Sequence, residues 1–325
     1  MIKLEKPAAV YEAAEAQRGM HWALELLVFV PVFIVAVLCE TIILFPGELL
    51  LLFGNPGYQE AFRTQDAERI LELSLEIASS DFYAILTLFA NIGMILAVWL
   101  FCRLLQKRRI RTLGFCGGKV LREYACGVGA GFLVFSVAVL ICVVTGALQI
   151  EGLSDAFSPG IFLLFTVGYM VQGMAEEVLC RGYFLVSVAR RYPLVVGIAA
   201  NSLFFAALHL FNNGISVLAF VNLTLFGVFA SLYFIRRGSI WGIGAFHSIW
   251  NLVQGNFYGI RVSGIQTECS VLQSGMLAGK ELWNGGEFGL EGGLAVTIVL
   301  LAGIAILLFV KGLDASARRK PEEAE

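Results

Sequence analysis

The sequence predicts an all-α, polytopic membrane protein of about eight transmembrane helices, with the candidate active site inside the helix bundle. Of its 325 residues, 58% are hydrophobic and only 15% are charged, and the mean hydropathy is +0.80. These values are typical of a chain whose solvent is mostly membrane lipid, and they exclude an ordinary soluble enzyme. The net charge of −2 gives no reason to expect nucleic acid as a partner.

Eight apolar segments reach the length of a membrane-spanning helix, which is roughly 20 residues. They lie near 22–45, 82–102, 124–148, 160–188, 194–211, 215–235, 239–258 and 293–311. The first apolar run is too long for a signal peptide, and it ends in Pro46-Gly47 without a small-x-small cleavage site. We therefore expect this segment to remain in the protein.

The positions of Lys and Arg predict the orientation, because basic loops stay on the cytoplasmic side of a membrane. Residues 103–123 carry seven basic residues and one acid, whereas 46–81 carries seven acids and two basic residues. Further basic residues follow the fourth, sixth and eighth segments: Arg190, Arg191, Arg236, Arg237, Lys311, Arg318, Arg319 and Lys320. The sequence thus predicts an integral protein of the cell membrane with both termini in the cytoplasm.

The candidate functional residues are the polar side chains inside the predicted spans, because an ionisable group at membrane depth is costly without a partner or a function. Glu25 and Glu40 of the first segment have no assigned role and are expected to form an interhelical hydrogen bond or to lie near the interface. The others fall in three segments, and two of the three His of the chain are among them. The fourth segment carries Glu176, Glu177 and Arg181, the fifth Phe205 and His209, and the seventh His247 and Asn251.

Residue spacing predicts how these side chains divide. Glu177 and Arg181 are four residues apart, so they share a helix face and are expected to form an ion pair. Glu176 is turned about 100° away and faces other helices. Counted at about 1.5 Å per residue, Glu176, His209 and His247 all fall in the middle of the bundle. A buried Glu beside two imidazoles is a candidate general base, and structural interhelical hydrogen bonds are the alternative role.

Three other hydrolase chemistries do not fit the chain. Aspartyl proteolysis needs two Asp within the membrane, and all four Asp lie in loops or in the tail. Neither His209 nor His247 begins a His-Glu-x-x-His zinc motif. No Gly-x-Ser turn of the kind that a Ser-His pair needs lies in a span.

The ordered set Glu176-Glu177-x-x-x-Arg181, Phe205-x-x-x-His209 and His247-x-x-x-Asn251 resembles the three motifs of the CPBP family. This family contains the type II CAAX prenyl endopeptidases and the bacteriocin-processing and immunity proteins of the Abi group. The resemblance covers roughly residues 120–258. It implies an intramembrane endopeptidase that cuts a membrane-associated peptide or a lipidated protein. It also implies roles: Glu176 activates water, His209, His247 and Asn251 position the water or stabilise the oxyanion, and Glu177, Arg181 and Phe205 support them.

Zinc is the open question about cofactors. Glu176, His209 and His247 could supply three ligands to a catalytic zinc ion, and the family has been labelled metallopeptidase on that ground. Asn251 favours a site without metal, because an amide is a poor zinc ligand and a good donor to an oxyanion. We therefore expect no metal.

The predicted organisation places the catalytic core between flanking membrane helices. The segments are 1–21 (cytoplasmic), 22–119 (membrane helices with an acidic outer loop), 120–258 (catalytic core), 259–292 (outer loop) and 293–325 (last helix and cytoplasmic tail). Two other functions remain as alternatives: a non-catalytic immunity protein that binds a peptide in the same pocket, and a proton-coupled transporter. The complete Glu-His-His-Asn set favours the peptidase over the immunity protein, and the lack of an inverted repeat counts against the transporter.

Overall fold

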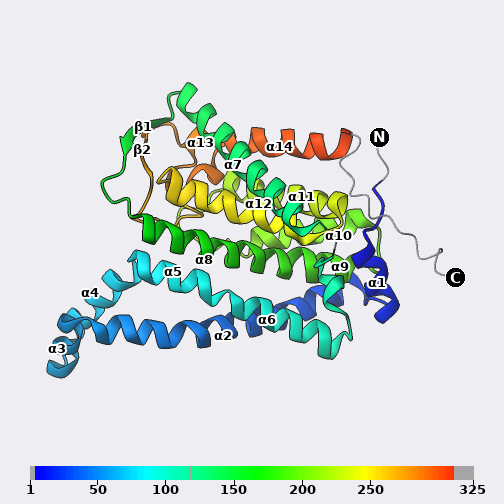
Figure 1. The fold of residues 1–325 in the computed structure, drawn as a ribbon, viewed down its shortest axis with the longest axis horizontal. Coiled ribbons are helices and arrows are strands. Elements are labelled where there is room, and N and C mark those ends of the chain that lie inside the picture. The colour runs from blue at the N-terminus through cyan, green and yellow to red at the C-terminus, as the bar shows by residue number, and fades with distance from the viewer. Residues whose placement is uncertain (1–3, 117–118, 311–325) are drawn as a thin grey trace.

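The computed structural model of the protein describes residues 4–116 and 119–310, and it is a bundle of long helices (Figure 1). Within these residues, five helices are long and apolar enough to cross a membrane. They are α2 (Trp22–Gly54), the run Asp81–Leu105 that begins with α5 (Asp81–Ala90) and α6 (Ile92–Leu100), α7 (Val120–Val144), the run Pro159–Ala189 that joins α8 (Pro159–Glu177) to α9 (Val186–Ala189), and α11 (Val217–Arg237). The polytopic helical class is confirmed.

The remaining predicted spans are shorter helices. They are α10 (Leu194–Ala207), α12 (Ile240–Leu252), which continues as a π-helical stretch Val253–Phe257, and α14 (Leu294–Phe309). Every predicted segment therefore contains helix, but the number of eight membrane crossings stays a prediction.

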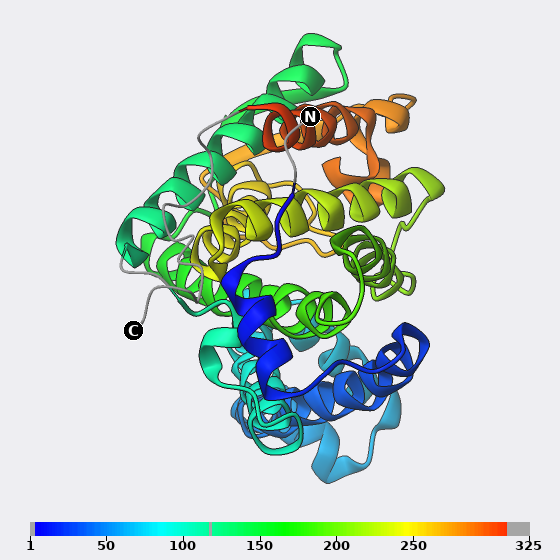
Figure 2. The same ribbon diagram turned by 90° about the vertical axis from the view of Figure 1, so that its right-hand side faces the viewer.

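The motif-bearing helices α8 and α12 lie in the interior of the bundle. In Figures 1 and 2, α2, α5 and α6 lie along one side of the molecule and α14 lies on the opposite side, with α8 and α12 between them. Helix α12 packs against α7 and α8, and α10 packs against α11. Helix α1 (Ala8–Ala16) crosses one end of the bundle beside α9. The end of α8 that carries the motif and most of α12 are therefore buried by other helices.

The predicted acidic loop 46–81 is mostly helical. Helix α2 continues through Pro46 to Gly54 instead of ending near residue 45, and α3 (Pro56–Thr64) and α4 (Ala67–Ala78) follow it. Asn55 and Asp66 cap the two short helices, since their side chains accept hydrogen bonds from the Gly57 and Arg69 backbone N–H groups. The stretch 70–77, with apolar residues among acids, is predicted from the sequence to be amphipathic and to lie along the interface or cap the bundle, and it forms part of α4. The sequence did not predict α3 or the continuation of α2.

A pair of short strands is the one departure from the all-α prediction within the described residues. Strand β1 (Leu148–Leu153) pairs antiparallel with β2 (Leu272–Met276), with a register irregularity between Ile150 and Gly152. Helix α7 ends at Val144, before the predicted 148, and Gly146 adopts a φ of +63° that a helix does not allow. The strand pair and the short helix α13 (Glu281–Asn284) hold the outer segment 259–292 against the bundle.

The predicted basic loop 103–123 contains one buried anchor. Arg108 is 1% exposed and donates hydrogen bonds to Ser187 Oγ at 3.1 Å and to the Gly182 carbonyl at 2.9 Å. Burial lowers the pKa of Arg108 to about 10, so the guanidinium stays charged at neutral pH. The other six basic residues of this loop are exposed. The predicted basic tail, with Lys311, Arg318, Arg319 and Lys320, lies outside the described residues, and the division of the chain into segments stays a prediction.

Candidate active site

Two adjacent carboxylates end helix α8 and have different surroundings. Glu177 and Arg181 have no exposed side-chain surface, and Arg181 Nη1 donates to Glu177 Oε1 at 2.9 Å. The chain is a π-helix at Val178–Leu185, a form that often occurs at functional sites. The Arg181 guanidinium also lies over the Phe205 ring, 4.8 Å from its centroid. The ion pair expected from the four-residue spacing is present.

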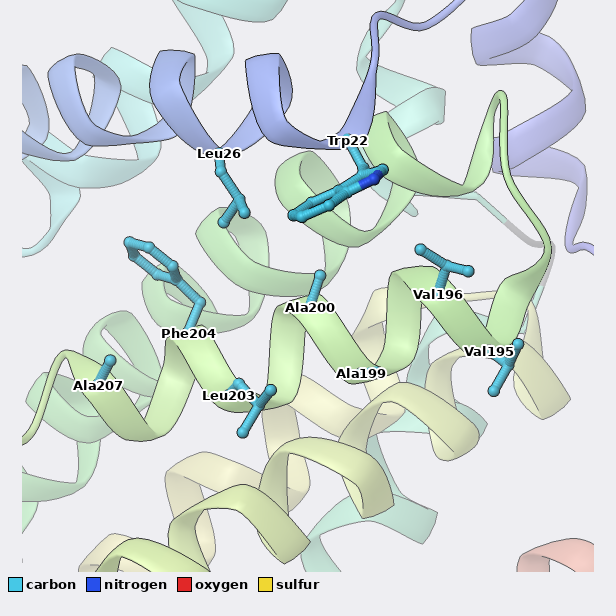
Figure 3. A pocket seen from close by; sticks show the side chains of 9 residues that line it. All are labelled: Trp22, Leu26, Val195, Val196, Ala199, Ala200, Leu203, Phe204 and Ala207. Atoms are coloured by element: carbon cyan, nitrogen blue, oxygen red, sulfur yellow. The ribbon is translucent and has the colours of Figure 1, made fainter.

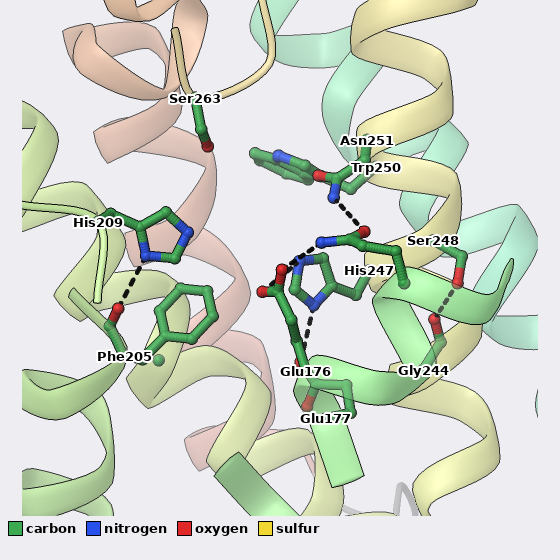
Figure 4. Close-up of polar contacts among 12 residues, drawn as sticks. Glu176, Glu177, Phe205, His209, Gly244, His247, Ser248, Trp250, Asn251 and Ser263 are labelled. Atoms are coloured by element: carbon green, nitrogen blue, oxygen red, sulfur yellow. Dashed lines mark hydrogen bonds and ion pairs between the residues drawn. The ribbon is translucent and has the colours of Figure 1, made fainter. Parts of the chain in front are cut away.

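His247 connects the two carboxylates of α8. Its Nδ1 lies 2.9 Å from Glu177 Oε1, and its Nε2 lies 3.7 Å from Glu176 Oε2 (Figure 4). An ionised carboxylate only accepts, so Nδ1 carries the hydrogen and Nε2 faces Glu176 with its lone pair when the ring is neutral. Glu177 therefore orients the imidazole. The sequence predicted only Arg181 as the partner of Glu177.

Gln172 is a site residue that the sequence reasoning missed. Its Nε2 donates to Glu176 Oε1, and its Oε1 accepts from Asn251 Nδ2 at 3.0 Å. The Gln172 amide therefore connects the predicted base to the predicted oxyanion donor. Gln172 lies four residues before Glu176, on the same helix face, and this spacing was the signal available in the sequence.

His209 is less closely joined to the site than the sequence predicted. Helix α10 ends at Ala207, so His209 lies in the following turn and not within the helix. Among the described residues its side chain has one hydrogen-bond partner, the Phe205 carbonyl, 2.9 Å from Nδ1. The Phe205 ring is near both imidazoles, with its centroid 4.9 Å from that of His209 and 6.0 Å from that of His247. Figure 4 shows the rings of His209 and Phe205 on one side of the site, and Glu176 and His247 on the other.

Glu40 on α2 is a third carboxylate near the site. Its charge interacts repulsively with that of Glu176, and its Oε1 is buried without a hydrogen-bond partner within the described part of the chain. This proximity could not be predicted from the sequence, because Glu40 and Glu176 are far apart in the chain.

The donor set as it is arranged does not fit a zinc ion. Across residues 4–116 and 119–310, no group of three or more His, Cys, Asp or Glu side chains is placed to hold a metal. Glu176 and His247 are neighbours, whereas the contacts of the His209 side chain within the described residues are with Phe205. The expectation of a site without metal stays a prediction.

An apolar groove of about 610 Å³ lies between α2 and α10 (Figure 3). It is lined by Trp22, Leu26, Val195, Val196, Ala199, Ala200, Leu203, Phe204 and Ala207. Phe204 lines this groove, whereas the next residue, Phe205, contacts Arg181. Helix α10 thus separates the groove from the polar site.

A carboxylate pair, an imidazole and two amides inside a bundle of membrane helices are the components of an intramembrane hydrolase. Residues 158–253 match the model of the family described as type II CAAX prenyl endopeptidase Rce1-like. The match runs from the start of α8 to the end of α12 and contains every motif residue from Glu176 to Asn251. The resemblance is thereby confirmed for this part of the chain, and the family is one of proteases. Neither a curated protein nor a solved structure matches the chain.

Proposed function

We propose that the protein is an intramembrane endopeptidase of the CAAX type in which Glu176 activates the attacking water. The contrast between the two carboxylates of α8 carries this proposal. The side chain of Glu176 is 21% exposed and lies beside a neutral amide and an imidazole, whereas Glu177 is fully buried and bonded to Arg181 and His247. Only Glu176 has a free side on which water and a peptide can meet.

Glu176 acts as general base in this mechanism. It takes a proton from water while the water oxygen bonds to the carbonyl carbon of the scissile peptide bond. The proton then passes to the amide nitrogen as the carbon–nitrogen bond breaks, so Glu176 returns to its ionised form. Nδ1 of His209 donates to the Phe205 carbonyl, and Nδ1 of His247 donates to Glu177 Oε1. The Nε2 atoms of neutral His209 and His247 are therefore free to accept hydrogens from water and to position it.

Asn251 supplies the oxyanion donor. Its Nδ2 carries two hydrogens, of which one is donated to Gln172. The second hydrogen remains for the oxygen that becomes negative in the tetrahedral intermediate. Because Gln172 also donates to Glu176, it aligns the base and the oxyanion donor with each other.

The matched family indicates a prenylated protein or peptide as the substrate class. A bacteriocin-like peptide is the other candidate substrate within the same proposal.

We further propose that the α1 end of the bundle faces the cytoplasm, because the exposed basic residues of 103–122 gather near it. A membrane-impermeant thiol reagent applied to whole cells should label Glu60→Cys and should not label Arg109→Cys, in a background where the exposed Cys126 is replaced. Labelling of Arg109→Cys alone would reverse the orientation.

A comparison of membrane proteomes tests the activity. Cells with the wild-type protein should contain a cleaved membrane-associated protein that accumulates uncleaved when Glu176→Gln replaces the wild type. With purified protein, a quenched fluorescent peptide that carries S-farnesyl cysteine four residues from its C-terminus should be cut, and the same peptide without the farnesyl group should be cut more slowly. If the wild type and Glu176→Gln bind the farnesylated peptide equally and neither forms a product, the result would instead support a peptide-binding immunity protein.

A further inference from the structure

A buried carboxylate outside the proposed catalytic set lies just before α14. Glu291 is 8% exposed and belongs to the short turn Leu290–Gly292. Among the described residues its side chain accepts three hydrogen bonds, all from neutral donors: Trp250 Nε1 at 3.1 Å from Oε1, and Ser263 N and Oγ at 3.0 and 2.7 Å from Oε2. A carboxylate is costly to bury, and three charge-assisted hydrogen bonds offset that cost. Each oxygen therefore binds a different element of the protein.

The hydrogen bond to Oε1 connects Glu291 to helix α12 beside the proposed site. Trp250 directly precedes Asn251, and its side chain is 1% exposed. Its ring centroid lies 5.7 Å from that of Phe226, which in turn lies 4.8 Å from the His247 ring. The hydrogen bond from Trp250 Nε1 to Glu291 thus helps to fix the rotation of α12, and with it the directions of His247 and Asn251.

The hydrogen bonds to Oε2 connect Glu291, through Ser263, to the turn that carries His209. Ser263 has a φ of +48°, a left-handed conformation that serine rarely adopts, and both of its donors point to Glu291. The Ser263 carbonyl accepts a hydrogen bond from Asn212 Nδ2 at 3.1 Å, and the Asn212 backbone N–H donates to the His209 carbonyl at 3.0 Å. The contacts therefore run in series from Glu291 through Ser263 and Asn212 to His209.

We propose that Glu291 is a positioning residue that sets the distance between the His209 turn and the His247 and Asn251 face of α12. This inference rests on the proposed peptidase function. His209 lies beyond the end of α10, where its backbone N–H donates to the Ala206 carbonyl at 3.1 Å and a single turn continues the helix. The outer segment adds a second constraint on this turn through Ser263, and Glu291 connects that constraint to α12. A misplacement of about 1 Å in a catalytic group can cost about 100-fold in rate.

The variant Glu291→Gln tests the inference, because it keeps the side-chain shape and turns one acceptor oxygen into an NH₂ donor. For the farnesylated peptide, kcat should fall roughly 10- to 100-fold while KM stays unchanged. Amide hydrogen exchange of residues 208–214 should become faster, while peptides of α8 keep their protection. Glu268→Gln, which alters an exposed carboxylate of the same outer segment, should change neither quantity.

Two further variants distinguish the contact with α12 from the contact with the His209 turn. Ser263→Ala removes one of the two Ser263 donors to Glu291. In combination with Glu291→Gln it should change kcat and hydrogen exchange little further, because both substitutions act through one contact. Trp250→Phe removes only the Nε1 donor and should lower kcat without speeding exchange at 208–214. Unchanged exchange in Glu291→Gln, or faster exchange with an unchanged kcat, would overturn the positioning role. Faster exchange in the variant together with no cleavage by the wild type would refute the peptidase activity while leaving the structural connection established.

Discussion

The buried ion pair Glu177–Arg181 beside the candidate site and the buried pair Glu25–Arg190 at the α1 end of the bundle have nearly the same construction. Their nitrogen–oxygen distances are 2.9 and 3.1 Å, and all four side chains are at most 2% exposed. In each pair the second carboxylate oxygen has no hydrogen-bond partner among the described residues.

Their neighbours differ. Glu25 accepts a second hydrogen bond from the Met20 backbone, and Arg190 donates to the Gln17 carbonyl, so this pair ties the N-terminal segment to the end of α9. Glu177 instead holds His247, whose other nitrogen faces the partly exposed Glu176. Burial of an ion pair therefore does not by itself distinguish the two regions. The candidate site differs in having an adjacent titratable group with a free side.

The largest expected difference between the two regions concerns turnover. Glu176→Gln should lower the rate of peptide cleavage by about 100- to 10,000-fold, which is the usual contribution of a general base, and it should leave protein yield intact. Glu25→Gln should leave the rate per folded molecule unchanged. Initial rates with the farnesylated peptide measure both variants. A Glu176→Gln variant that cuts at the wild-type rate would remove Glu176 from the mechanism.

The next difference separates stability from activity. Glu177→Ala leaves Arg181 buried without its anion, at a cost of about 3–5 kcal/mol. Glu25→Ala should cost less, because Arg190 still donates to two carbonyls, those of Gln17 and Ser187, whereas Arg181 keeps a longer hydrogen bond to the Gly227 carbonyl at 3.4 Å. Unfolding midpoints in detergent measure the two costs. Activity per folded molecule should fall only for Glu177→Ala, since His247 then loses its orienting partner, and an equal fall in both variants would contradict the comparison.

A smaller effect is expected from the amide that faces the substrate. Asn251→Ala should lower kcat by about 100- to 1000-fold, as expected for the loss of one oxyanion donor. Asn201→Ala is the matched control, because Asn201 is a buried amide whose hydrogen bond goes to the Ser231 hydroxyl on α11 and not to Gln172 or a carboxylate. It should keep its rate per folded molecule. If Asn251→Ala keeps the wild-type rate, the oxyanion must be stabilised by other groups.

The smallest expected effect is that of metal removal. We predict that elemental analysis finds no stoichiometric zinc in the purified protein, that a chelator leaves the cleavage rate unchanged, and that Asn251→Ala does not alter metal content. The candidate site and the Glu25–Arg190 region would then both consist of protein groups alone, and they would differ only in the titratable groups beside the ion pair. About one zinc per chain, lost together with activity in His209→Ala, would restore the metallopeptidase interpretation.

Much of the local structure could be predicted from the sequence. The Glu177–Arg181 pair follows from a four-residue helical spacing, and the helices follow from apolar runs, because a backbone in lipid must satisfy its own hydrogen bonds. Errors arose where a local rule did not apply. Helix α10 ends before His209, α2 passes through Pro46, and β1 pairs with a strand more than 100 residues later.

The sequence by itself determined the class of the protein and the chemical types in its site, because lipid excludes ionisable groups that have no partner or function. It could not determine which of these groups touch. The contact of Glu177 with His247 joins residues 70 apart, the contact of Gln172 with Asn251 joins residues 79 apart, and the contact of Glu291 with Trp250 joins residues 41 apart. Such contacts depend on the rotation and depth of each helix against its neighbours. Helix packing across the whole bundle sets these quantities, so only the tertiary structure decided which carboxylate orients the imidazole and which one is left to face water.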